Sequence, residues 1–344
     1  MKRALTALAA MVLLAAGIAA LVVRHELGSL DAPLALQAPL RFKVAGGTSF
    51  ARLAGELASR GIVTHPRAWV WYARWTGTAA AIKAGEYEIA PGATPRSLLS
   101  KMIRGEVVMH SFTIIDGWRL EELLEALRRS PQIVATLPAQ PGDLMAKLGD
   151  PGVPAEGQFL PETYRFPGGT TDLELLGLAH AALKRELAAA WADRDPGVPL
   201  KSAEELLIVA SIVEKETANP AELGKVAGLY LHRLGIGMRL QADPTVIYGL
   251  GERYDGDLHT VDLRTDGPYN TYTRAGLPPT PIALPGAAAI RATAHPEKTD
   301  ALYFVASDRG DGSHVFSATL EQHNAAVARY VARQRARAAA GATR

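Results

Sequence analysis

The chain has 344 residues, no cysteine and a formal net charge of +2, with 48% hydrophobic and 21% charged residues. This length predicts two or three domains with ordinary globular cores. The near balance of charge argues against a dedicated nucleic-acid binder. Because cysteine is absent, disulfides, thiol nucleophiles and thiolate metal sites are excluded, and the cellular compartment must be inferred from other features.

The N-terminus carries an apolar segment from Ala4 to Val23, interrupted only by Thr6 and preceded by two basic residues. About 20 apolar residues can cross the hydrocarbon core of a bilayer, whereas the apolar region of a cleaved signal usually has about 7–15. We therefore expect residues 1–27 to form a cytoplasmic tip and a transmembrane anchor, with the rest of the chain outside the cytoplasm. The small residues at 16–20 leave a cleaved signal as the alternative.

A pattern of strand, turn and amphipathic helix occurs twice after the spacer at 28–40. The first copy predicts a strand at 41–44 and a helix from Phe50. The second predicts a strand at 85–89 and a helix that ends before Gly105, and a weaker third copy follows.

This order of strand, Gly-x-Thr turn and short helix resembles the small sugar-binding LysM module, which would occupy residues 41–108. Segment 69–75, with three Trp residues, makes the module a variant. A plain α+β packing domain explains the pattern equally well, and three closely spaced Trp residues are more often core than a sugar platform. We expect this region to support glycan binding and to contain no catalytic group.

Segment 206–217 has the sequence Leu-Leu-Ile-Val-Ala-Ser-Ile-Val-Glu-Lys-Glu-Thr, in which an apolar run passes directly into two carboxylates. Ser202 precedes it as a helix cap, so the sequence predicts a core helix. Helical spacing from Val209 places Glu216 at the end of the core-facing stripe, whereas Glu214 points elsewhere. A carboxyl at the rim of an apolar wall can have a raised pKa and act as an acid near neutral pH. A solvated helix end is the alternative.

Three further segments, at 156–167, 238–249 and 268–279, set aromatic and polar side chains among Gly and Pro. Flat rings beside amide and hydroxyl groups suit a sugar, which offers apolar ring faces and many hydroxyls. The alternative for each tyrosine is simple packing with its hydroxyl satisfied. The candidate substrate-binding residues are Glu156, Tyr164, Gln241, Asp243, Tyr248, Tyr269, Asn270 and Tyr272.

Six motifs in the second half of the chain belong together: Glu-Lys-Glu-Thr at 214–217, Leu-Gln-Ala-Asp-Pro-Thr-Val-Ile-Tyr-Gly at 240–249, Tyr-Asn-Thr-Tyr at 269–272, Gly-Leu-Pro-Pro at 276–279, Ala-His-Pro at 294–296 and Leu-Tyr-Phe-Val-Ala at 302–306. With these motifs the chain resembles the MltG (YceG-like) endolytic murein transglycosylases over the range from about Glu156 to Asn324. One departure is Gly-Asp-Gly-Ser-His at 310–314, where the hairpin is slightly longer than usual.

The resemblance implies an α+β enzyme on the periplasmic side of the inner membrane, with a YceG-like catalytic domain at 109–332 and a lytic-transglycosylase-like catalytic helix. It would cleave the β-1,4 bond between MurNAc and GlcNAc within nascent peptidoglycan strands and leave 1,6-anhydroMurNAc ends. Glu216 would act first as acid and then as base, without a cofactor. Peptidoglycan synthases are the expected protein partners. The remaining residues, 333–344, predict a frayed helix and a disordered tail.

Two other functions remain open. A muramidase would hydrolyse the same bond with a second carboxylate, for which Glu156 and Asp243 are the candidates. A glycan-binding scaffold of the cell-wall synthesis machinery would bind without cutting. The nine histidines are scattered and no His-Glu-x-x-His motif occurs, so we expect no metal site. We expect Asn270, Gln241 and the tyrosine hydroxyls to position the sugar, and Asp243 to cap or brace the turn at Pro244.

Overall fold

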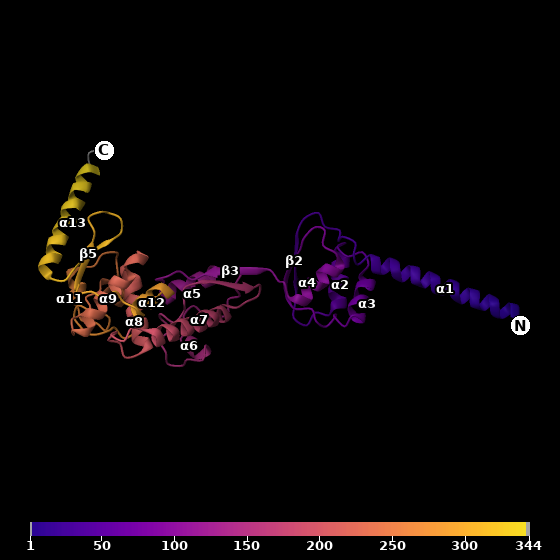
Figure 1. Ribbon diagram of the computed structural model, residues 1–344, viewed down its shortest axis with the longest axis horizontal. Coiled ribbons are helices and arrows are strands. Elements are labelled where there is room, and N and C mark those ends of the chain that lie inside the picture. Colours follow the sequence, from indigo (N-terminus) through magenta and orange to yellow (C-terminus); the bar gives the residue numbers. More distant parts are fainter. Residues whose placement is uncertain (1, 342–344) are drawn as a thin grey trace. The chain divides into compact units, whose positions relative to one another are not determined.

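The computed structural model describes residues 2–341 and combines α-helices with three two-stranded sheets (Figure 1). This mixture of helix and strand agrees with the predicted α+β class. The chain divides into two units, which are described separately. The first comprises Met1–His110 and Arg165–Thr170, and the second comprises Ser111–Tyr164 and Thr171–Arg344.

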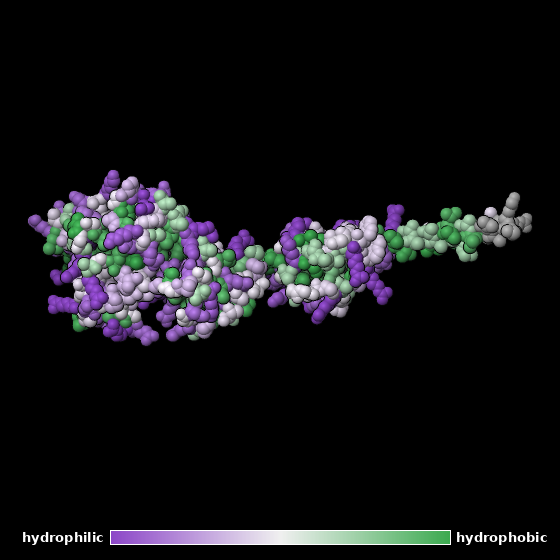
Figure 2. Space-filling model, turned by 90° about the horizontal axis from the view of Figure 1, so that it is seen from below, coloured by the Kyte–Doolittle hydropathy of each residue, from purple (hydrophilic) through white to green (hydrophobic). Residues whose placement is uncertain are grey.

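The first unit begins with an apolar helix, α1 (Lys2–Gly28). Its segment Leu8–Gly28 has a mean hydropathy of 2.0 and is not buried against the rest of the protein. Figure 2 shows hydrophobic side chains along this helix. By length and composition the helix can cross a membrane, as the sequence predicts. Met1, part of the predicted cytoplasmic tip, lies outside the described residues.

Both predicted copies of the strand and helix pattern form in the first unit. The two strands pair antiparallel, with Phe42 opposite Tyr87. Side chains of Ser49 and Thr94 accept hydrogen bonds from the first turns of the two helices, which satisfies amide groups that have no partner within the helix. The elements after α1 are, in chain order, β1 (Leu40–Val44), α2 (Phe50–Ser59), α3 (Pro66–Trp75), β2 (Gly85–Ile89) and α4 (Pro95–Arg104).

The three Trp residues of α3 have two different environments. Trp69 is fully buried and packs edge-on against Phe50, with 4.8 Å between ring centroids. Trp71 and Trp75 are 51% and 71% exposed, and their rings stack with 5.8 Å between centroids. Residues four apart share one face of a helix, and this face points away from the core. The expectation that these Trp residues are core is therefore correct for Trp69 only.

The second unit is built around α8, the helix predicted from its apolar run. The residues from Leu206 to Val213 are all buried, and α7, α9, α10 and α12 pack against the helix. The elements of this unit, with the strands at its boundary, are β3 (Met109–Thr113), α5 (Leu120–Arg129), α6 (Leu144–Lys147), β4 (Thr163–Pro167), α7 (Asp172–Asp193), α8 (Ala203–Glu216), η1 (Pro220–Glu222), α9 (Leu223–Gly235), α10 (Asp243–Leu250), η2 (Gly251–Arg253), α11 (Thr260–Arg264), α12 (Ala287–Ala294), β5 (Tyr303–Ala306), β6 (His314–Ser317) and α13 (Leu320–Gly341).

Polar side chains fix the start of α8, its middle and the turn that joins it to α9. Ser202 accepts a hydrogen bond from the Glu205 amide at the start of α8, as predicted. Buried Ser211 accepts a 3.0 Å bond from the Ile282 amide, which fixes a distant loop against the helix. After α8 ends, Asn219 accepts from the Ala221 amide and begins the turn that leads into α9. These contacts fix where the C-terminal end of α8 lies.

The C-terminal segment is described as helix for most of its length. We expected a frayed helix and a disordered tail over 333–344, and α13 continues to Gly341. The sequence of this segment is rich in Ala and Arg, which have high helix propensity. Residues 342–344 lie outside the described part of the chain.

Candidate active site

A cavity of about 350 Å³ in the second unit contains the carboxyl of Glu216, at the C-terminal end of α8. Of the predicted site residues, the structure brings four together here: Glu216, Gln241, Asp243 and Tyr272. The remaining lining residues come from α9, β5 and α13, and they are Tyr230, Arg233, Tyr303, Phe304, Leu320 and His323.

The surroundings of Glu216 favour its protonated form. Burial raises the pKa of the carboxyl to about 7, and the nearby charge of Asp243 contributes in the same direction. A 2.6 Å hydrogen bond from the Tyr230 hydroxyl and the positive charge of Arg233 lower the pKa but do not offset the effect of burial. At neutral pH, Glu216 therefore exchanges easily between acid and base.

Glu214 lies outside this cavity, as its helical position predicts. Its carboxylate accepts a 3.0 Å hydrogen bond from the Gly286 amide at the start of α12. Burial raises the pKa of Glu214 as well, and the nearby charge of Asp116 acts in the same direction. The different partners of Glu214 and Glu216 confirm that the two carboxylates occupy different faces of α8.

Arg233 is a buried cation that fixes the backbone of the cavity wall. It is 5% exposed, and its guanidinium donates to the carbonyl of Leu302 at 2.7 Å and to the carbonyl of Leu240. Burial lowers the pKa of Arg233. Because Leu240 and Leu302 directly precede Gln241 and Tyr303, one side chain holds two lining residues in place.

Gln241 adopts an unusual backbone conformation. It is the only residue other than glycine with a positive φ, 50°, among the described residues 2–341. Its amide donates to the Thr271 carbonyl at 3.2 Å, and the next amide, of Ala242, donates to the Thr271 hydroxyl at 3.0 Å. Such conformations are disfavoured for residues with a Cβ and persist where the surrounding structure holds them, often at functional sites.

Asp243 does not provide the cap that we expected at the turn before Pro244. Asp243 is the first residue of α10, and the cap position belongs to Ala242 without a side-chain cap bond. Its carboxylate accepts a 2.5 Å hydrogen bond from the Tyr272 hydroxyl instead. Asp243 thus contributes a charge to the cavity and orients a tyrosine from a segment 29 residues away.

Asn270 organises a loop and does not line the cavity. It is 5% exposed, and its side-chain nitrogen donates to the carbonyls of Asp262 and Thr265 at 2.9 and 2.8 Å. Its side-chain oxygen accepts from the Tyr272 amide at 2.9 Å. With both ends of the amide in use, Asn270 supports Tyr272 and is not available to a sugar.

Four other predicted residues lie elsewhere in the second unit. The rings of Tyr248 and Tyr269 meet edge to face, 4.8 Å apart, and the Tyr248 hydroxyl donates to Glu156 at 3.3 Å. Glu156 also accepts from the Leu120 amide at 3.0 Å, and burial raises its pKa. Tyr164 is 8% exposed and donates to a backbone carbonyl. For the three tyrosines, the alternative of packing with a satisfied hydroxyl describes these contacts.

Comparison with known proteins assigns the family. A model described as the YceG-like family matches residues 42–329. The chain belongs to the YceG-like family. An endolytic murein transglycosylase of Bacillus subtilis (strain 168) is 30% identical over 311 residues, which cover 85% of each chain. An endolytic murein transglycosylase of Streptococcus pneumoniae serotype 2 is 26% identical over 329 residues, which cover 83% of this chain and 57% of that protein.

Among solved structures, a crystal structure of a yceG-like protein from Listeria monocytogenes matches this YceG-like chain at 27% identity. The match covers 84% of this chain and 99% of that chain, with a TM-score of 0.49.

Sequence analysis missed six lining residues of this YceG-like cavity, Leu320 and His323 of α13 among them. Tyr230 and Arg233 lie three positions apart and share one face of α9, and this spacing could have indicated them. Tyr303 and Phe304 belong to a motif that was quoted for the resemblance but received no role. No local pattern marks His323, which reaches the cavity only because α13 packs against β5.

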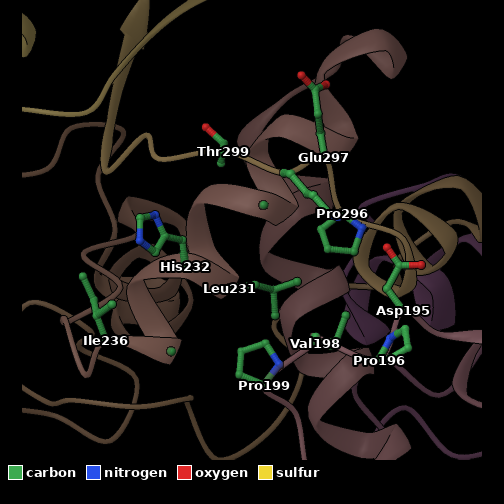
Figure 3. Close-up of a pocket in the computed structure, with 14 residues that line it drawn as sticks. Asp195, Pro196, Val198, Pro199, Leu231, His232, Ile236, Pro296, Glu297 and Thr299 are labelled. Carbon is green, nitrogen blue, oxygen red and sulfur yellow. The ribbon is translucent and has the colours of Figure 1, made fainter.

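A larger cavity, of about 770 Å³, lies against other residues of α9 in this YceG-like protein (Figure 3). Helical spacing places Gly228 and His232 on the opposite face of α9 from Tyr230. The cavity contains none of the predicted site residues, and its Asp195 is paired with His295 at 2.8 Å. We therefore place the candidate chemistry in the smaller cavity.

Proposed function

We propose that this protein is an endolytic murein transglycosylase that cleaves the β-1,4 bond between MurNAc and GlcNAc within peptidoglycan strands. The relatives that bear this name cover most of the chain, which supports the reaction class. The observation that carries the proposal is the single carboxyl of Glu216, whose pKa of about 7 suits both halves of an acid and base cycle.

In the proposed reaction, the Glu216 carboxyl donates its proton to the oxygen that links MurNAc to GlcNAc, and the bond to the anomeric carbon breaks. An oxocarbenium-like state forms on MurNAc. The Glu216 carboxylate then takes the proton from the C6 hydroxyl of MurNAc as that oxygen bonds to the anomeric carbon. The products are a free GlcNAc hydroxyl and a 1,6-anhydroMurNAc end. No water is consumed, and Glu216 returns to its protonated form.

The cavity walls support the remaining requirements of this reaction. The negative charge of Asp243 can stabilise the developing positive charge, and its bond to Tyr272 fixes its orientation. Gln241 offers an amide on a backbone that its neighbours constrain. Positioning the C6 hydroxyl against the anomeric carbon in this way can contribute several kcal/mol to the rate, on the order of 7–11 in favourable cases.

We further propose that residues 1–27 anchor the protein in the inner membrane, with the N-terminus in the cytoplasm and the catalytic domain, 109–332, in the periplasm. The exposed apolar surface of α1 supports the anchor. Protease added to spheroplasts should digest the catalytic domain, and protection would overturn the orientation. A mature chain that begins near Leu21 would instead indicate a cleaved signal.

We also propose that residues 41–108 form a LysM-like module that supports glycan binding, and that peptidoglycan synthases are partners. The two strand and helix copies around β1 and β2 support the module. Its deletion should weaken cleavage of long glycan strands more than that of short fragments. Equal losses on both substrates would show that the module is part of the active site or of the fold.

Mass spectrometry of glycan strands incubated with the full chain tests the reaction. Anhydro ends, lighter by one water than hydrolysed ends, are the expected product. Glu216→Gln should bind strands but retain less than a few per cent of the cleavage, because the amide cannot donate the proton. Glu214→Gln is the matched control on the same helix and should lose much less. Hydrated ends would indicate a muramidase, and binding without cleavage a scaffold.

A further inference from the structure

The exposed surface of α3 is not explained by core packing or by the proposed reaction. Trp71 and Trp75 are 51% and 71% exposed, and their rings are nearly parallel, with an angle of 6° between them. Arg67 and Arg74 are exposed beside them, and neither forms an ion pair with any of the residues that the structure describes. We call these four residues the α3 face.

The α3 face adjoins the end of the apolar helix α1. A cavity of about 350 Å³ is lined by Arg67, Ala68 and Trp71 on one side and by residues from the last two turns of α1 on the other, which are Val22, Val23, Glu26 and Leu27. His65, at the start of α3, bonds to Glu26 of α1 at 3.2 Å. These contacts fix the position of α3 relative to the C-terminal end of the apolar segment.

We propose that the α3 face lies in the headgroup layer of the membrane that α1 crosses. This inference depends on the proposed membrane anchor. The 21 residues of Leu8–Gly28 form a helix of roughly 30 Å, at about 1.5 Å per residue, which equals the thickness of the hydrocarbon core. Val22 to Leu27 therefore reach the membrane surface on the side where the chain continues. A side chain packed beside them lies at the same depth.

The chemistry of the α3 face matches this depth. Tryptophan is enriched where membrane and water meet, because its ring is apolar and its N–H can bind water or headgroups. Arginine side chains can extend along apolar surface and place the guanidinium at a lipid phosphate. Two Trp residues and two unpaired Arg residues on one helix face thus fit an anionic phospholipid surface.

A glycan is the other ligand that exposed Trp residues suggest, but the α3 face suits it less well. Part of one face of each ring is already covered by the other ring, because Trp71 and Trp75 lie parallel with 5.8 Å between their centroids. Its four side chains include no carboxylate or amide, the groups that accept hydrogen bonds from sugar hydroxyls, and the carboxylate of Glu26 in the adjoining cavity is already bonded to His65 at 3.2 Å. The observations therefore favour lipid.

Fluorescence quenching by lipid tests the inference. The full chain is reconstituted in vesicles of phosphatidylcholine and phosphatidylglycerol that carry bromine on the acyl chains near the headgroups. Five Trp residues are present, and Trp69 is buried while Trp118 and Trp191 belong to the second unit. The double variant Trp71→Phe/Trp75→Phe should lose most of the quenching. The matched control, Trp118→Phe/Trp191→Phe, should keep the quenching. The quenched fraction of its total Trp fluorescence should be larger, because two Trp residues that are not expected to be quenched are gone.

Flotation of the vesicles shows whether the protein is attached to the membrane. It therefore tests the anchor separately from the position of the α3 face. Protein that floats, with equal fractional quenching in the wild type and the Trp71→Phe/Trp75→Phe variant, would overturn the α3 face alone. Protein that does not float would overturn both the anchor and the α3 face. If chitotetraose, a soluble GlcNAc oligomer, changes the fluorescence of Trp71 and Trp75 while brominated lipid does not, the face binds glycan and the inference is wrong.

Discussion

The hydroxyl of Tyr230 donates a hydrogen bond of 2.6 Å to Oε1 of Glu216. The donor comes from α9 and the acceptor from the end of α8, so the packing of these two helices sets the distance. Tyr230 is 2% exposed and cannot easily turn away. The bond stabilises the charged carboxylate and opposes the burial that raises the pKa of Glu216 to about 7.

Tyr230→Phe should therefore raise the pKa of Glu216 further. Because the proposed reaction begins with the protonated carboxyl, the high-pH limb of the pH–rate profile should move upward by about 1–2 pH units, since a hydrogen bond to a charged group contributes about 1.5–3 kcal/mol. Release of anhydro ends, measured across the pH range, gives the limb. Tyr303→Phe is the control, because it removes a hydroxyl elsewhere in the same cavity. It should leave the pH of the high-pH limb unchanged. A limb that moves downward in Tyr230→Phe would contradict this assignment.

Asp243→Asn should have the opposite effect. The charge of Asp243 raises the pKa of Glu216, so its removal should move the high-pH limb downward by a few tenths of a unit to about 1 unit. The turnover should also fall because the developing positive charge loses a stabilising partner. Mass spectrometry should still find anhydro ends. A trapped glycosyl-enzyme, or hydrated ends, would replace the single-carboxyl mechanism with a two-carboxylate one.

The raised pKa of Glu216 also predicts how stability changes with pH. The folded-state pKa, about 7, exceeds the ordinary value of 4.5, so the folded protein binds this proton more tightly than the unfolded chain. The resulting stabilisation is complete below about pH 4.5 and is lost as the pH rises through 7. Glu216→Gln has no carboxyl to lose this proton. The Tm of the variant minus the Tm of the wild type should therefore be larger at pH 8 than at pH 4.5.

Thermal unfolding of both proteins at the two pH values checks this prediction. Glu121→Gln, at an exposed position of α5, is the control because it removes a carboxylate without burial. Its Tm difference from the wild type should be the same at both values. If Glu216→Gln gains nothing at pH 8, the carboxyl is not held in a desolvated site.

Gln241 allows its backbone and side-chain contributions to be separated. Gln241→Ala should lower turnover on the order of 10²-fold, as the loss of a positioned donor does, with a much smaller change in binding. Gln241→Gly should lose the same turnover but be more stable than the Ala variant by about 1 kcal/mol, because glycine adopts a positive φ without strain. Turnover and denaturant unfolding of the two variants give both quantities. Equal stability would mean that the backbone is not strained.

Local sequence signals were enough to predict α8 and its catalytic candidate. The cap at Ser202, the apolar run and the helical spacing all act within one helix, so they determine which side of it Glu216 occupies. The paired strands of the first unit and the stop at Gly105 were predictable for the same reason.

The composition of the cavity wall was harder to predict, because it depends on contacts between distant segments. Tyr272 and Asp243 are 29 residues apart, and only the packed structure shows that they bond. Tyr248 and Tyr269 have the same residue type and similar surroundings in sequence, yet they pack on each other outside the cavity. Residue type indicated which side chains suit a sugar, but it could not indicate which of them line the same cavity.

The structure changes the prediction for Asn270 from substrate contact to support of a loop. Asn270→Ala leaves backbone carbonyls and the Tyr272 amide without partners, so we expect a loss of stability of about 1–3 kcal/mol and a fall in turnover as Tyr272 loses its position. Asn270→Asp should be less stable than the Ala variant, because its carboxylate cannot donate and would face the carbonyls of Asp262 and Thr265. Tm and the separate changes in kcat and KM test this role. A variant with wild-type Tm and a raised KM would return Asn270 to the substrate-binding site.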